Sequence, residues 1–221
     1  MTYTWNFQIL DSYRWLLMKG TLVTIGLTVG ITVLGLIVGL LAGLAQVSRS
    51  AILRWISWAY IELFRCTPLL VQLLWVYYAL PIFTGIDMTA ISSCVLTLTL
   101  YGGSFYAEII RGGIVSIEAG QYEAGLALGL RPLRVMRRIV LPQAIKRMIP
   151  PLMNQTIINF KNTSLVSVLA VPDLLYRGQM AATETYRPLE VYTVVGLIYF
   201  VVLVPLTVIV KKSEKRLGKS H

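Results

Sequence analysis

The sequence contains one histidine, His221, and two cysteines, Cys66 and Cys94. Because no histidine occurs elsewhere in the chain, histidine-based catalysis and histidine ligation of a metal within the fold are excluded. Both cysteines fall within apolar stretches and lack partners at a metal-binding spacing, so we interpret them as packed free thiols. No metal site is predicted.

The sequence also lacks a glycine-rich loop ending in Lys and then Ser or Thr, the pattern that holds nucleotide phosphates in many ATPases. It contains no nucleophile–base pair and no histidine–glutamate metal motif. We therefore predict no catalytic residue and no cofactor bound by this chain. An integral-membrane enzyme would need a cluster of titratable groups that is not found, and turnover by the isolated chain would revive that alternative.

Charged residues are scarce, at 14% of the 221 residues, whereas 56% are hydrophobic. Residues 20–47 and 191–210 carry no charge, and about 20 apolar residues suffice to cross the hydrocarbon core of a bilayer. The first run is too long for the core of a signal peptide and lacks a small-residue cleavage pattern. The sequence therefore predicts an all-α integral membrane protein.

Five apolar segments define the expected transmembrane helices. They are residues 20–47, 56–80, 90–110, 148–171 and 191–210. Residues 1–19 mix aromatic and charged side chains, and we expect them to form an interfacial segment. Since no soluble domain or internal repeat is visible, residues 1–221 are expected to form a single transmembrane domain.

The 20 Lys and Arg residues give a net charge of +10, but they gather at the ends of the apolar segments. That distribution indicates membrane topology rather than a nucleic-acid partner. With five spans and the N-terminus outside, fourteen basic residues face the cytoplasm and four face the outside. The positive-inside rule therefore predicts a cytoplasmic C-terminus and a cytoplasmic loop at residues 112–147, between spans three and four.

The cytoplasmic loop contains a predicted helix from about residue 121 to residue 130, rich in good helix formers. Gly129 provides a position without a Cβ, which suits the end of this helix or the close approach of another backbone. Pro132 can open the next helical piece at its first turn. A basic run follows before apolar sequence resumes near Pro142, so the sequence predicts a positively charged helical elbow.

Several residues of this loop lie at a spacing that resembles the signature of ABC importer permeases, with Gly125 in place of the second alanine. They are Glu123, Ala124, Gly125, Gly129, Ile139, Leu141 and Pro142. The resemblance implies a coupling helix that docks in a groove of a separate ATPase subunit, with Glu123 and Gly129 at the contact. ATP and Mg²⁺ would then be bound by the partner. An ordinary cytosolic loop is the alternative interpretation. If exposed, Gly125 is expected to loosen the helix by roughly 0.5–1 kcal/mol.

Residues 64–72 also resemble amino-acid importer permeases, which usually have glycine at the position of Cys66. Pro68 is expected to bend the second span, because it removes one backbone hydrogen bond. Just before this stretch, Glu62 and Arg65 lie three residues apart on one helix face. For this intramembrane pair, a structural ion pair and a functional role both remain open.

The inner end of the third span repeats this spacing with Glu108 and Arg111, which we expect to pair. In the first span, Gly35, Gly39 and Gly43 recur at four-residue intervals. This spacing offers a small-residue face for close helix packing.

The fourth expected span is unusually polar, and Pro150 and Pro151 are expected to break its beginning. Its polar residues of interest are Gln155, Asn159, Lys161, Asn162, Thr163 and Ser164. Four of these, all but Lys161 and Ser164, fall on one helix face. Since a polar stripe is unstable in lipid, it must face the bundle interior or a water-filled path. We interpret it as a substrate pathway, with interhelical hydrogen bonding in the absence of substrate as the alternative.

Lys161 within a span is a functional candidate, held by a carboxylate or by helix carbonyls. Residues 161–165 look like a stretch common in polar amino-acid permeases, many of which carry Asp at the position of Asn162. A carboxylate there could hold a ligand ammonium, whereas an amide can only hydrogen-bond it. Asn162 therefore argues against a cationic substrate such as arginine and favours glutamate, aspartate or glutamine.

Together these resemblances imply the membrane-spanning subunit of a bacterial type I ABC importer for polar amino acids, within the histidine/glutamine/glutamate/arginine permease family. The implied location is the cytoplasmic (inner) membrane. The implied partners are two ATPase subunits, an extracytoplasmic substrate-binding protein, and a second copy or a sister permease. An ATP-independent secondary transporter or channel is the alternative, and it predicts uptake by this chain alone in vesicles.

Overall fold

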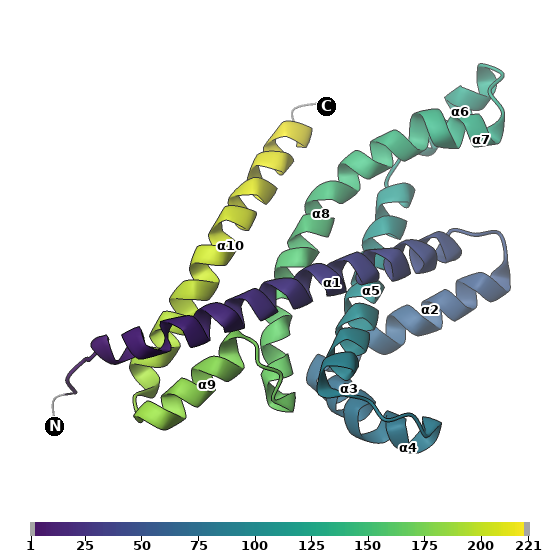
Figure 1. The fold of residues 1–221 in the computed structure, drawn as a ribbon. Helices are drawn as coiled ribbons and strands as arrows, with labels where there is room; N and C mark the ends of the chain where they lie inside the picture. Colours follow the sequence, from purple (N-terminus) through teal and green to yellow (C-terminus); the bar gives the residue numbers. More distant parts are fainter. Residues whose placement is uncertain (1–2, 219–221) are drawn as a thin grey trace. The chain divides into compact units, whose positions relative to one another are not determined.

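The structure, a computed structural model, describes residues 3–218 and is helical throughout that range apart from turns and connections (Figure 1). The α-helices are α1 (Arg14–Gln46), α2 (Ala51–Arg65), α3 (Leu69–Leu74), α4 (Leu80–Thr84), α5 (Ala90–Val115), α6 (Ala119–Ala127), α7 (Pro132–Val135), α8 (Leu141–Asn162), α9 (Leu174–Thr185) and α10 (Pro188–Gly218). Two 3₁₀ helices cover Gln8–Tyr13 and Thr163–Leu169, and two π-helical segments cover Trp75–Ala79 and Met136–Val140. The all-α prediction is confirmed.

Among the described residues, 3 helices are long and apolar enough to cross a membrane: Gln8–Gln46, Ala90–Val115 and Pro188–Glu214. A fourth span results if α2 and Leu69–Thr84 are counted together, although they bend by 103° at their break. The expected fourth span falls on α8 and the 3₁₀ helix after it. Its prolines, amides and Lys161 make α8 less apolar than the other three. The five-span topology and its orientation stay predictions.

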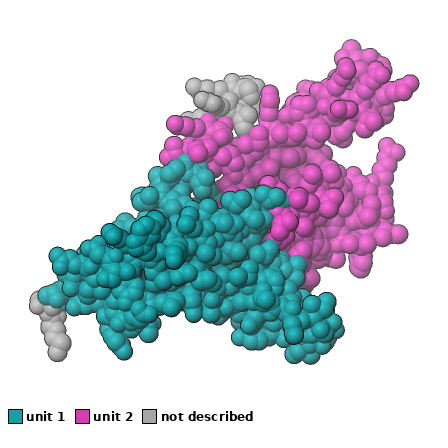
Figure 2. Space-filling view, viewed as in Figure 1, with its two compact units in different colours: residues 1–33, 69–98, 157–207 teal, residues 34–68, 99–156, 208–221 magenta. Residues whose placement is uncertain are grey.

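The chain divides into two compact units (Figure 2). Unit 1 comprises residues 1–33, 69–98 and 157–207, and unit 2 comprises residues 34–68, 99–156 and 208–221. Both are built from segments distant in sequence, because α1, α5, α8 and α10 each pass from one unit into the other.

The N-terminal segment of unit 1 continues directly into the first span. The 3₁₀ helix Gln8–Tyr13 leads into α1 without a break, so residues 14–19 belong to the helix rather than to a separate segment. Leu10 and Leu17 are buried in a cluster with residues of α9 and α10, and this packing holds the helix together across its charged positions. Glu190 accepts hydrogen bonds from the Tyr3 hydroxyl and, at 3.1 Å, from the Asn6 amide.

The second expected span is broken. Helix α2 ends at Arg65 and α3 begins after Pro68, as the proline predicts. Two further prolines, Pro81 and Pro142, each follow a π-helical segment. The amide of Leu80 donates to the carbonyl of Trp75, and that of Leu141 to the carbonyl of Met136. Proline has no N–H, so the residue before each proline supplies the last backbone donor. In the π-helical turn this amide donates to the carbonyl five residues earlier, rather than four as in an α-helix.

Pro150 and Pro151 lie inside α8, so the expectation that they break the fourth span is wrong. The carbonyls that they leave without a donor belong to Lys146 and Arg147, four residues earlier. Both of these residues are exposed, so water can reach that turn of the helix.

Candidate functional sites: the elbow and the charged pocket

The elbow consists of α6, α7, the π-helical segment and the start of α8 (Figure 1). Gly129 ends α6 in the left-handed conformation, with φ of 77°. The amide of Leu130 donates to the carbonyl of Gly125 at 3.2 Å, and the amide of Gly129 donates to the carbonyl of Leu126 at 2.9 Å. This pair of bonds is a Schellman motif, which requires a residue that tolerates positive φ. The helix predicted at about residues 121–130 is α6, which spans Ala119–Ala127, and Gly129 terminates it. The predicted start of the next helix at Pro132 is confirmed.

Gly125 is buried beneath the elbow rather than exposed. A Cβ built on it would lie 2.8 Å from Cγ1 of Val135 and 3.0 Å from Cδ1 of Ile139. Helix α6 therefore approaches α7 and the π-helical segment at a distance that only glycine permits. The expected loosening at an exposed Gly125 does not apply, because the close contact turns this position into a packing site.

The outer surface of the elbow presents an apolar tip, which we define as Leu128 and Leu133. Their side chains are 80% and 78% exposed. Glu123 and Ala124 are also exposed on α6. Four exposed arginines follow in the sequence: Arg131, Arg134, Arg137 and Arg138. Such a surface suits a partner groove with an apolar floor, acidic groups opposite the arginines and a basic group opposite Glu123. Neither leucine belongs to the permease motif. Their positions next to Gly129 and Pro132, at the turn between two helices, are the sequence feature that could have predicted the tip.

The remaining residues of the predicted coupling site differ in their exposure to solvent. Ile139 is partly buried and faces Gly125, so it helps to build the elbow. Gly129, Leu141 and Pro142 are exposed and remain accessible to a partner.

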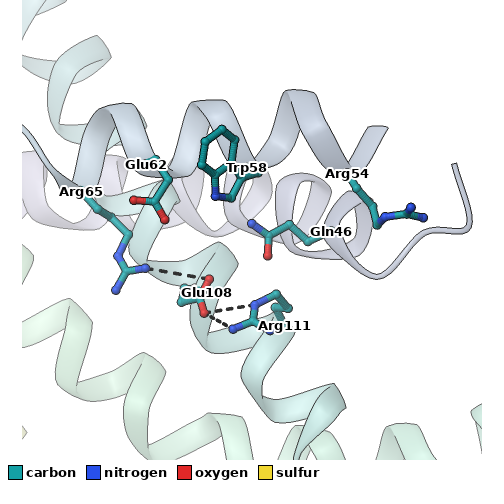
Figure 3. Close-up of a pocket in the computed structure, with 7 residues that line it drawn as sticks. All are labelled: Gln46, Arg54, Trp58, Glu62, Arg65, Glu108 and Arg111. Carbon is teal, nitrogen blue, oxygen red and sulfur yellow. Dashed lines mark hydrogen bonds and ion pairs between the residues drawn. The ribbon is translucent and has the colours of Figure 1, made fainter. Parts of the chain in front are cut away.

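A second site in unit 2, the charged pocket, has a volume of about 390 Å³ (Figure 3). It is lined by Gln46, Arg54, Trp58, Glu62, Arg65, Glu108 and Arg111. These residues come from the end of α1, from α2 and from α5. Two hydrogen bonds hold α2 in place: the Ser57 hydroxyl donates to the Ala42 carbonyl at 2.7 Å, and the Tyr60 hydroxyl donates to the Leu100 carbonyl at 2.6 Å.

Small residues bring α1 against α5 beside this pocket, as their spacing predicts. A Cβ on Gly39 would lie 2.5 Å from Cβ of Tyr106, and a Cβ on Gly43 would lie 2.8 Å from the Ala107 carbonyl oxygen. The close approach of these helices fixes where the pocket walls stand.

Glu108 is the centre of the ion pairs in the pocket. Its Oε1 accepts from Nε of Arg111 at 3.1 Å and also from a terminal nitrogen of the same guanidinium, so the predicted pair is confirmed. Its Oε2 lies 3.9 Å from a terminal nitrogen of Arg65. The Arg65 guanidinium also sits over the ring of Phe105, 5.4 Å from its centroid.

Of the two alternatives for Glu62 and Arg65, the structural ion pair is not formed among the described residues, and Arg65 pairs with Glu108 instead. Arg65 is the last residue of α2, and from that end its side chain reaches Glu108 on α5. Glu62 instead accepts a hydrogen bond from the thiol of Cys66 at 3.1 Å. Helical spacing had indicated which residues share a face, but the distance to another helix decides the pairing.

Both cysteines are free thiols, but only Cys94 is packed as expected. Cys66 is exposed at the C-terminal end of α2, so the expectation that it is packed is wrong.

The polar stripe on α8 is largely buried. The exposed fractions are 5% for Gln155, 3% for Asn159 and 0% for Thr163, and Asn162 is partly buried. These residues therefore face the protein interior, as a polar face in a membrane helix must.

Lys161 lies off this stripe and is exposed. Among the described residues it forms no ion pair, so the carboxylate expected to hold it is not found. Ser164 is partly buried, and its hydroxyl donates to the Lys161 carbonyl at 2.8 Å. The lysine side chain is therefore separated from the amides with which the sequence grouped it.

Residues 35–219 match the family described as the binding-protein-dependent transport system inner membrane component. This chain belongs to that family. This chain is similar to the glutamine transport system permease protein GlnP of Escherichia coli (strain K12). The two are 37% identical over 203 residues, which cover 91% of this chain and 93% of GlnP. It is 35% identical to the arginine transport system permease protein ArtQ of Bacillus subtilis (strain 168), over 91% of this chain and 92% of ArtQ.

Among solved structures, the family member resembles a chain from the crystal structure of an amino acid ABC transporter with histidines. The TM-score is 0.92 at 34% identity, and the match covers 97% of this chain and 100% of the other. The chain is thus a multi-pass protein of the bacterial inner membrane and a transporter subunit, not an enzyme. Membership implies work with a separate ATPase, a binding protein and a second membrane subunit.

Proposed function

We propose that this family member is the membrane subunit of an ATP-driven importer for a polar amino acid with an amide or acidic side chain, such as glutamine. The observation that supports the coupling role is the elbow, whose exposed residues include the apolar tip and Glu123. Exposed leucines of this size cost solvation free energy unless a partner covers them. A relative named for glutamine transport supports an amide cargo, and one named for arginine transport supports a polar amino acid more broadly.

In this mechanism the elbow docks on an ATPase subunit, with Glu123, Ala124 and Gly129 at the contact and Leu128 and Leu133 in an apolar floor. Gly125 and Ile139 hold the elbow in shape. ATP and Mg²⁺ bind to the ATPase, and their binding favours one arrangement of the paired ATPases. Because the elbow binds that arrangement, the permease follows it between inward-open and outward-open states.

The substrate pathway in this proposal follows the buried stripe of Gln155, Asn159, Asn162 and Thr163. Amide and hydroxyl groups offer donors and acceptors to a polar side chain without carrying a charge. A carboxamide substrate can therefore be matched group for group, whereas a guanidinium would find no carboxylate in the stripe. Lys161, which lies off the stripe, and Ser164 would act at its border.

The complete importer would contain two ATPase subunits, an extracytoplasmic substrate-binding protein and either a second copy of this chain or a sister permease. To test this, the chain is co-expressed with its ATPase and placed in liposomes with its binding protein. We expect L-glutamine or L-glutamate to stimulate ATP hydrolysis and to be taken up only with ATP. Uptake of the same amino acids by the chain alone, without the ATPase, would refute the proposal in favour of a secondary transporter or channel.

A further inference from the structure

The charged pocket places 3 arginines and 2 glutamates around one open volume formed by membrane helices. Ionised side chains at such positions are costly unless they are paired, wetted or used by a ligand. The function proposed above uses the elbow and the α8 stripe, and it leaves this pocket without a role.

Most of the charges in the pocket are already engaged. Glu108 and Arg111 bind one another. Arg54 donates to the carbonyls of Ser48 and Arg49, at 3.0 and 2.9 Å. These three side chains therefore serve the wall of the pocket.

Glu62 and Arg65 are the exceptions. Within residues 3–214, Glu62 forms no ion pair, and its carboxylate accepts only from the thiol of Cys66. Arg65 reaches Glu108 only at 3.9 Å, and 36% of its side chain is exposed. Glu62 and Arg65 both project from α2 into the pocket (Figure 3). Among the described residues, Glu62 is thus without an ion pair, whereas Arg65 lies over Phe105 and is only distantly paired with Glu108, so its guanidinium keeps nitrogens that can bind a ligand.

We propose that the charged pocket binds the zwitterionic head of an α-amino acid, with Arg65 on its carboxylate and Glu62 on its ammonium. Side chains three residues apart on a helix have Cβ atoms about 5–6 Å apart, which suits two opposite charges carried on one carbon atom. The volume of about 390 Å³ lies in the usual range for small-molecule sites, about 300–1,000 Å³. The inference rests on the proposed function, because it takes the cargo to be an amino acid.

None of the residues that line this pocket belongs to the α8 stripe, and the two offer different chemistry. The stripe offers uncharged groups that suit the amino-acid side chain. The pocket offers one charge of each sign, which suits the head group shared by all amino acids. Guanidinium binds carboxylate with two parallel hydrogen bonds, and the Arg65 guanidinium keeps nitrogens beyond the one near Glu108 for this purpose.

The test measures equilibrium binding to the permease–ATPase complex in detergent, without the binding protein. The probes are L-glutamine and L-glutamate, the α-hydroxy analogue of each, in which a hydroxyl replaces the ammonium, and the α-amide of each, which lacks the α-carboxylate. We expect the wild-type complex to bind the amino acids at least about tenfold more tightly than either analogue, because each charged contact is lost separately. Equal binding of all three kinds of probe, or no binding of the amino acids, would overturn the inference.

Two variants test which side chain binds the ammonium and which binds the carboxylate. Glu62→Gln should weaken amino-acid binding about tenfold and leave binding of the α-hydroxy analogue unchanged. Arg65→Gln should weaken both of those and leave the α-amide unchanged; Glu108 keeps Arg111 as its partner in this variant. Asp87→Asn, an exposed carboxylate outside the pocket, is the matched control and should change nothing.

Co-purification with the ATPase and the unfolding temperature show whether each variant is assembled. If either variant fails to assemble, the wild-type comparison of the analogues decides. ATP-driven uptake by the wild-type complex is measured in parallel, so the two proposals can fail separately. Normal uptake with a Glu62→Gln complex that still discriminates the α-hydroxy analogue would overturn the pocket alone, whereas absent uptake by wild type would overturn the importer.

Discussion

At the residue scale, the least expected finding concerns Gly125, which the motif places on a helix surface and the structure places under Val135. A methyl group there would be closer than 3.0 Å to both Cγ atoms of Val135, a contact that forces atoms to move. A β-branched side chain has little freedom to rotate away. The tightness of the elbow therefore depends on one missing methyl group.

We expect Gly125→Ala to destabilise the elbow by about 1–3 kcal/mol, the usual cost of overpacking. The variant should show a lower unfolding temperature of the assembled complex or weaker co-purification with the ATPase. Gly125→Ala combined with Val135→Ala should recover most of the loss, since the smaller side chain makes room. A single variant as stable as wild type would contradict the packing assignment.

Asp173 lies in the connection before α9, outside the helices long enough to cross a membrane. Its Oδ1 caps α9 by accepting from the amide of Tyr176 at 2.8 Å. Its Oδ2 is buried without a hydrogen-bond partner among the described residues. Burial raises the pKa of Asp173 from 3.8 to about 6, against the lowering effect of the backbone amides.

The native state therefore keeps a proton on Asp173 that the unfolded chain releases between pH 3.8 and about 6. Stability from this group is fully present below that window, falls as the pH rises through it and is constant above it, a loss of roughly 3 kcal/mol in all. Asp173→Asn keeps a capping oxygen and removes the titration. Unfolding temperatures at pH 4 and pH 7 should show the variant gaining on wild type as the pH rises. An equal difference at both pH values would argue against a raised pKa.

At the scale of elements, the elbow is closely packed at Gly125 and has a mixed surface. Its shape comes from Gly125, Gly129 and Pro132, whereas its chemistry comes from exposed side chains such as Glu123. A change confined to the surface should thus affect docking without affecting the fold.

Glu123→Lys is expected to abolish ATPase docking and to leave membrane insertion intact, because it reverses the charge at the proposed contact. Asp87→Lys reverses an exposed charge elsewhere and should leave docking unchanged. Affinity purification through a tag on the ATPase measures the retained permease. Undiminished co-purification of the Glu123→Lys variant would refute the contact.

The breaks between elements were partly predictable. Pro68 interrupts the second span as expected, and the first helix of the elbow, α6, ends before Gly129 as its sequence indicates. Pro150 and Pro151 were misjudged because the cost of a proline in a helix depends on whether the freed carbonyl can meet water. That depends on the exposure of Lys146 and Arg147, which is a property of the folded chain.

At the scale of the whole molecule, transport requires a polar path through helices that are otherwise apolar. Gln155, Asn159 and Thr163 are buried, so they can contact either a substrate or neighbouring helices. A hydrogen-bonding role without substrate would affect assembly, whereas a pathway role would affect transport. Asn162, which is only partly buried, separates these two roles best.

Asn162→Leu should lower ATP-driven amino-acid uptake substantially, because it removes both hydrogen-bonding groups from the stripe. Assembly with the ATPase should change little, since this side chain is not fully packed. Uptake in liposomes and co-purification measure the two effects. Normal uptake by an assembled Asn162→Leu complex would count against the pathway.

The sequence by itself determined the membrane class, the helical elbow and the family resemblance, because long apolar runs, the position of glycine and proline, and a fixed spacing of motif residues are local properties. Only the tertiary structure decided that Arg65 reaches Glu108, that Gly125 is buried and that Cys66 is exposed. These outcomes depend on which helices come within a few ångströms of each other. Spacing along one helix cannot specify that distance.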